Sequence, residues 1–92
     1  MDISKMLTVS TAHISKETAE MLDKDTDTLD IVVYNKKEYG WFIYIPFYYD
    51  NNKLYIPKDL HNLLIFAKDS SCDWLCLDRD GEILENLETY EW

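Results

Sequence analysis

Ser10, Thr11 and His13 lie close together in the chain, where a hydroxyl and an imidazole could act as nucleophile and general base. Such a site also needs a group that orients the histidine and a glycine-rich turn that forms an oxyanion hole. Nothing near these residues supplies either part. We therefore expect His13 to fix a strand-to-helix junction by hydrogen bonding. A small enzyme or ligand-binding domain with its site near His13 stays open as an alternative.

Cys72 and Cys76 could form half of a zinc site, because thiolates are common ligands of structural zinc. On a strand, a spacing of four residues places them roughly 13 Å apart. No second ligand pair follows, and the two histidines, His13 and His61, stand alone in the sequence. The sequence therefore predicts two buried and reduced thiols, with no metal and no cofactor.

The segment Asp78-Arg79-Asp80-Gly81 follows an apolar run and looks like the aspartyl nucleophile motif of haloacid-dehalogenase-like phosphatases. That chemistry needs a long downstream α/β domain, whereas only eleven residues of this sequence follow Gly81. A calcium loop fits no better, because Cys76 and Leu87 stand where the EF-hand pattern has ligands. We expect a tight turn between two strands.

Acidic residues gather in two blocks. Residues 17–30 hold six acids and one base, and residues 72–92 hold seven acids and one base, which contributes −5 and −6 to a formal net charge of −9. Segregated charge creates a directed negative field. Affinity for nucleic acids and anionic membranes comes largely from cationic contacts to phosphate, so the sequence disfavours both. We expect a basic protein as partner, such as a nucleic-acid-binding effector.

The second block has a period of three. Its repeating residues are Glu82, Glu85, Glu88 and Glu91 on one side, and Leu84, Leu87 and Tyr90 on the other. A helix would give adjacent acidic and apolar stripes, whereas a strand would send the glutamates to alternate faces. Regularly placed carboxylates can imitate the charge layout of a nucleic-acid backbone, although a solvated face needs no function.

Residues 44–55 are rich in aromatic side chains: Tyr44, Phe47, Tyr48, Tyr49 and Tyr55. Exposed tyrosines favour interfaces, including self-association, but these rings could simply cover a sheet face opposite the helices. A structural homodimer joined through the strand at 41–45 is a further alternative. We predict these partner-binding residues: Asp23, Asp25, Asp27, Tyr48, Tyr49, Asp50, Asp78, Asp80, Glu82, Glu85, Glu88 and Glu91.

These residues must be positioned by alternating strands and helices. The expected strands are 6–10, 29–34, 41–45, 54–56, 72–78 and 82–84, with 88–92 either adding an edge strand or packing over the sheet. One helix is capped by Ser15 and runs to about Asp23, and another begins at Pro57. The order predicts one α+β domain over residues 1–92. It has a mostly antiparallel sheet of four to five strands, with two helices on one face in a split β-α-β-like order.

The composition agrees with a folded domain, since 47% of the residues are hydrophobic and 14% are aromatic. The longest nearly continuous apolar stretch, residues 41–49, is half as long as a membrane crossing requires. The N-terminus lacks the pattern of an export signal. We therefore expect a cytoplasmic protein.

Four segments carry a resemblance to known proteins: Ser10–Ser15 (STAHIS), Tyr39–Pro46 (YGWFIYIP), Cys72–Gly81 (CDWLCLDRDG) and Tyr90–Trp92 (YEW). They resemble a family of small bacterial and phage-borne proteins of unknown function that are carried by mobile elements. No catalytic residue of that family can be carried over. The resemblance implies a context of conflict between phage and host.

Charge and context together favour a non-enzymatic acidic binding protein, such as an inhibitor of a CRISPR effector. Electrostatic steering by the carboxylates, followed by burial of tyrosines, would give binding that weakens steeply with salt.

Overall fold

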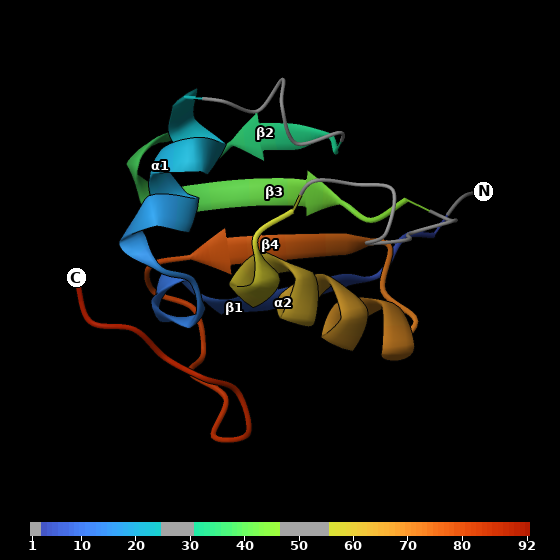
Figure 1. Cartoon of the computed structure of the whole chain (residues 1–92). Coiled ribbons are helices and arrows are strands. Elements are labelled where there is room, and N and C mark those ends of the chain that lie inside the picture. The colour runs from blue at the N-terminus through green and yellow to red at the C-terminus, as the bar shows by residue number, and fades with distance from the viewer. Residues whose placement is uncertain (1–2, 25–30, 47–55) are drawn as a thin grey trace.

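Four strands form one mixed sheet in the order β1-β4-β3-β2 (Figure 1). They are β1 (Met6–Ser10), β2 (Val33–Asn35), β3 (Gly40–Tyr44) and β4 (Trp74–Asp78). The computed structural model describes residues 3–24, 31–46 and 56–92. β1 pairs with β4 in parallel, whereas β4 with β3 and β3 with β2 are antiparallel. The predicted α+β class is confirmed, and the sheet is mixed because its first and last strands run side by side.

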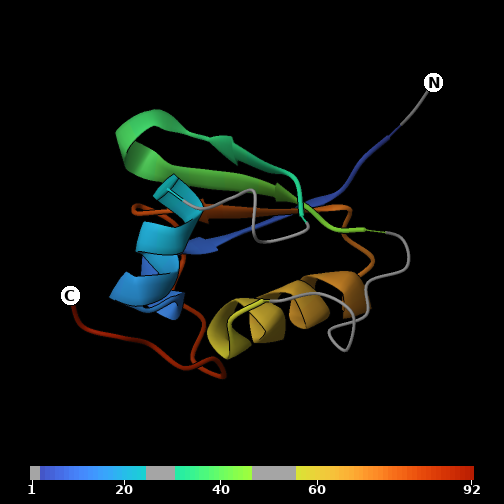
Figure 2. The ribbon, with the colours of Figure 1, turned by 45° about the horizontal axis from the view of Figure 1, so that its top comes forward.

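The two helices cover the same face of this sheet (Figure 2). They are α1 (Lys16–Lys24) and α2 (Lys58–Asp69), and short 3-10 turns, Thr11–His13 and Lys37–Tyr39, precede α1 and β3. The apolar stripe of α2 is buried at Leu60, Leu63, Leu64 and Ala67. It faces the strand positions that alternate inward, of which Ile43, Leu75 and Leu77 are fully buried. Among the described residues, no helix lies on the opposite face of the sheet, which we call the helix-free face (Figure 2).

The first turns of the two helices are tied to each other. The hydroxyl oxygen of Ser15 accepts the Thr18 N–H at 3.2 Å, as the predicted N-cap requires. Asp59, in the first turn of α2, accepts the Ser15 N–H at 2.7 Å and the Thr18 hydroxyl at 2.8 Å. A short helix is marginal alone, so these bonds fix where α1 begins relative to α2.

Gly40 opens β3 at a point where no side chain fits. Its φ is +150°, and a Cβ there would lie 1.7 Å from the carbonyl oxygen of Leu77. The turn before β3 therefore approaches the backbone of β4 directly.

The predicted hairpin after Asp80-Gly81 is wrong. The tight turn itself forms, since the Gly81 N–H donates to the Asp78 carbonyl at 2.8 Å. Residues 82–84, however, are not a strand. β1 pairs with the edge of β4 that a hairpin would need, so the returning chain cannot pair there. It makes one hydrogen bond with the end of β1 instead: the Ser10 N–H donates to the Glu82 carbonyl at 2.9 Å.

Other boundaries differ from the expectation by smaller amounts. β2 begins only at Val33, β4 begins at Trp74 rather than Cys72, and residues 88–92 form no edge strand. The expected strand at 54–56 falls mostly outside the described residues, as do positions 29 and 30 of the strand expected at 29–34. Within the described ranges, neither helix has the length and apolar character that crossing a bilayer demands.

Candidate functional site

His13 holds the C-terminal part of the chain through both of its ring nitrogens. It is 2% exposed, and its Nδ1 lies 2.8 Å from the Glu88 carbonyl oxygen. The Leu84 N–H donates to its Nε2 at 3.0 Å. Because Nε2 accepts, the ring is neutral, with its proton on Nδ1 donated to Glu88. His13 thus joins the strand-to-helix junction to residues 84–88.

Three further hydrogen bonds, one of them the bond from the Ser10 N–H described above, attach this segment to residues 10–14. Besides the bond from Ser10, the Tyr90 N–H donates to the Ala12 carbonyl at 2.8 Å. The indole N–H of Trp92 donates to the Ile14 carbonyl at 2.8 Å. Residues 80–92, which we call the acidic segment, therefore have a fixed path although they form no helix or strand.

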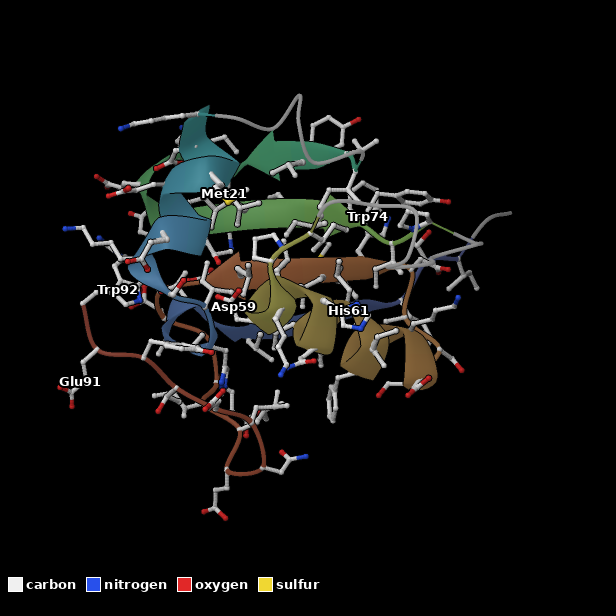
Figure 3. All side chains as sticks on the ribbon, viewed as in Figure 1. Met21, Asp59, His61, Trp74, Glu91 and Trp92 are labelled. Atoms are coloured by element: carbon white, nitrogen blue, oxygen red, sulfur yellow. The ribbon has the colours of Figure 1, made fainter. Side chains whose placement is uncertain are left out.

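In the acidic segment, the period of three separates half-buried apolar side chains from exposed acidic ones. Leu84 and Leu87 pack against the core, and Tyr90 is half-buried. The exposed positions are Asp80, Glu82, Glu85, Glu88 and Glu91. The segment contains these five acids and no base. We call these five exposed carboxylates the anionic strip, and its last member, Glu91, lies beside Trp92 (Figure 3).

Asp78 does not belong to this strip. It is half-buried on the helix-free face of the sheet and forms an ion pair with Lys36. The Lys36 ammonium lowers the pKa of the Asp78 carboxyl, helped by the hydrogen bond from the Asp80 N–H, and the carboxylate in turn raises the pKa of Lys36. Asp78 therefore stabilises the sheet through its ion pair with Lys36, and its negative charge is largely neutralised before any partner could bind.

The first acidic block is only partly within the described residues. Glu17, Glu20 and Asp23 are exposed on α1. The Oδ1 of Asp23 accepts the indole N–H of Trp41 at 2.9 Å, so this carboxylate also orients a core side chain. The predicted site residues Asp25, Asp27, Tyr48, Tyr49 and Asp50 lie outside the described residues.

A cleft of about 400 Å³ separates α1 from the turn before β3. Aromatic rings of Tyr39, Trp41 and Trp92 line it, and the guanidinium of Arg79 stacks 4.6 Å from the Tyr39 ring centroid. Its charged lining residues are balanced: Lys16, Lys37 and Arg79 against Glu20, Asp23 and Glu38. Such a lining selects neither anions nor cations. The sequence does not predict this cleft, because its residues come from four separate segments.

A family comparison gives the chain a place among known sequences. A family model described as "Family of unknown function (DUF5983) C-terminal domain" matches residues 6–92. The chain belongs to this family. No curated protein and no solved structure matches it. This match confirms the expected membership in a family of unknown function, and it assigns neither an origin nor an activity to this DUF5983 domain.

The residues near His13 do not form a nucleophile-base pair in this DUF5983 domain. A hollow of about 300 Å³ adjoins His13, with Asp59 and Tyr90 in its lining. Both nitrogens of the imidazole are engaged by backbone groups, and the Ser10 hydroxyl oxygen accepts the Ala12 N–H at 3.0 Å. Neither side chain is positioned to activate the other.

The cysteines of the DUF5983 domain are free thiols. Cys76 is buried beside Lys36, and burial raises the pKa of its thiol, which keeps it protonated at neutral pH. Cys72 is half-buried. In the part of the chain that the structure describes, no three His, Cys, Asp or Glu side chains converge where they could hold a metal.

Proposed function

We propose that this protein is a non-enzymatic acidic binding protein that docks its acidic segment onto a basic surface of a partner protein. The observation that carries the proposal is the combination of a fixed backbone and exposed carboxylates, among which Glu88 accepts a hydrogen bond from the Tyr90 hydroxyl at 3.2 Å. His13, Ser10, Ala12 and Ile14 hold the path of residues 80–92, while all five acidic side chains of the segment are exposed.

Preorganisation makes such a strip more effective than a flexible acidic tail. A partner does not have to order the backbone on binding, so less conformational entropy is lost. The clustered charge raises the rate of encounter with a cationic surface, and this effect falls as salt screens the charges. The single ion pair among the described residues uses Asp78, which lies outside the strip.

The partner class that fits best is a protein that itself binds nucleic acid. Carboxylates at every third residue present a row of negative charge, as phosphates do, and a DNA- or RNA-binding groove is a cationic surface built to accept one. The resemblance to phage-borne proteins supports a role as a mobile-element inhibitor of a nucleic-acid-handling defence system, such as a CRISPR effector. Such an inhibitor acts in the cytoplasm of its host and does not bind nucleic acid itself.

A displacement assay tests this proposal. Fluorescently labelled DNA bound to each of a panel of purified CRISPR effector nucleases is titrated with the wild-type protein. We expect release of the DNA from at least one effector, with no binding of the protein to the free DNA. If the protein displaces DNA from none of the effectors in the panel, the CRISPR assignment is contradicted.

A matched pair of variants separates the acidic segment from net charge alone. Glu82→Gln with Glu85→Gln, and Glu38→Gln with Asp69→Asn, each remove two exposed carboxylates and leave the same formal charge. Exposed ion pairs contribute about 0.2–1 kcal/mol each, so the first pair should weaken displacement by about twofold to thirtyfold. The second pair should change it less than twofold. Equal losses in the two variants would show that position within the fold does not matter.

A further inference from the structure

The helix-free face of the sheet is apolar at one end. The strand registers align Met6, Trp74 and Tyr44 in one row across β1, β4 and β3, and the Tyr44 N–H bonds to Val32 at its far edge. The next row on the same face ends in Phe42 of β3 and Tyr34 of β2. We call these six residues the aromatic face: Met6, Val32, Tyr34, Phe42, Tyr44 and Trp74.

The aromatic face is exposed although its rings contact one another. Tyr34 is 56% exposed and Tyr44 is 40% exposed. The Tyr44 and Trp74 rings meet edge to face with centroids 5.3 Å apart, and Tyr34 lies 6.0 Å from Trp74. Contiguous apolar surface of this kind marks an interaction site in soluble proteins.

Charge decides which partner this face can accept. Near it, Lys36 and Asp78 neutralise each other, so the face itself is close to neutral in a chain of net charge −9. Trp74 lies at one end of the sheet, whereas Trp92 and Glu91 lie at the other (Figure 3). A basic partner therefore gains little here. A second copy of this acidic chain meets the least repulsion here, because the acidic segment of each copy ends at the opposite end of its sheet (Figure 3).

We propose that the aromatic face is the contact surface of a homodimer. Two-fold symmetry brings the same patch of each copy together, so the exposed rings of one copy pack against those of the other. β3 lies between β4 and β2, so the expected homodimer through residues 41–45 cannot form by pairing strand edges. It forms through the exposed side chains of the sheet instead.

Sedimentation equilibrium over a range of protein concentrations tests the dimer. We expect the mass to rise from one chain of 11.0 kDa toward twice that value. Tyr44→Glu should raise the dissociation constant at least tenfold, since it places a carboxylate in the contact. Ile83→Glu is the matched control, because Ile83 is 60% exposed on the acidic segment, and it should leave the constant within twofold. Circular dichroism confirms that both variants fold.

Salt gives this contact a signature opposite to that of the acidic segment. Raising the salt concentration screens the repulsion between two acidic chains, so dimerisation should strengthen, whereas binding to a basic partner should weaken. A mass of one chain at every concentration would overturn the proposal. So would a dimer that weakens with salt, or one that Tyr44→Glu leaves intact. None of these results bears on the acidic segment.

Discussion

Replacing His13 with alanine should release the acidic segment and destabilise the fold. The change removes two hydrogen bonds from an imidazole that is 2% exposed. Each bond contributes about 1 kcal/mol net, and the half-buried Leu84 N–H that loses its acceptor adds a desolvation penalty of up to about 2 kcal/mol. We therefore expect a loss of about 2–4 kcal/mol in the free energy of unfolding.

Two measurements together test this expectation. Urea denaturation gives the change in the free energy of unfolding, and hydrogen exchange reports the protection of the Leu84 amide. His13→Gln is the informative control, since its side-chain oxygen can still accept from Leu84 while the bond to Glu88 is lost, and its cost should be smaller. A loss below about 0.5 kcal/mol in the alanine variant, with the Leu84 amide still protected, would refute the role assigned to His13.

Three further changes have defined outcomes. Gly40→Ala should cost at least about 3 kcal/mol in thermal or urea unfolding, because its Cβ would meet the carbonyl oxygen of Leu77 at 1.7 Å; unchanged stability would contradict that close approach. Asp59→Ala should cost about 2 kcal/mol in urea unfolding, because two donors at the start of α1 lose their acceptor, and unchanged stability of the variant would contradict this. The pKa of Asp78 is lowered by Lys36, so the stability that it contributes is present above the ordinary carboxyl pKa of about 4 and is lost as pH falls through the lower folded value. Urea unfolding of wild type and Asp78→Asn should therefore differ near pH 6 and converge in strong acid, and a constant difference would be inconsistent with the ion pair.

Local patterns in the sequence predicted most of the elements. The cap at Ser15 and the helix beginning at Pro57 each depend on neighbours within a few residues, and the structure has both. The tight turn at Asp80-Gly81 was equally readable. The conformation of residues 82–84 could not be predicted in this way, because it depends on the pairing of β1, some seventy positions earlier, with the edge of β4.

The candidate site shows the same division. The period of three in residues 82–91 indicated an acidic side and an apolar side, but it fits neither an α-helix nor a strand, and the segment forms neither, so the sequence did not predict which surface would result. His13 was recognised as a hydrogen-bonding residue, whereas its partners, Leu84 and Glu88, lie more than seventy residues away. The cleft beside Trp92 likewise arises only when distant segments meet.

The salt dependence of partner binding tests the central claim most directly. The dissociation constant for the effector whose DNA is released is measured at several salt concentrations for the wild type and for a variant with Glu82, Glu85, Glu88 and Glu91 all changed to Gln. The wild type should bind steeply more weakly as salt rises, and the variant should bind at least about tenfold more weakly in low salt with a much shallower slope. Two parallel lines of equal affinity would contradict the claim that a fixed anionic strip on residues 80–92 recognises a basic partner.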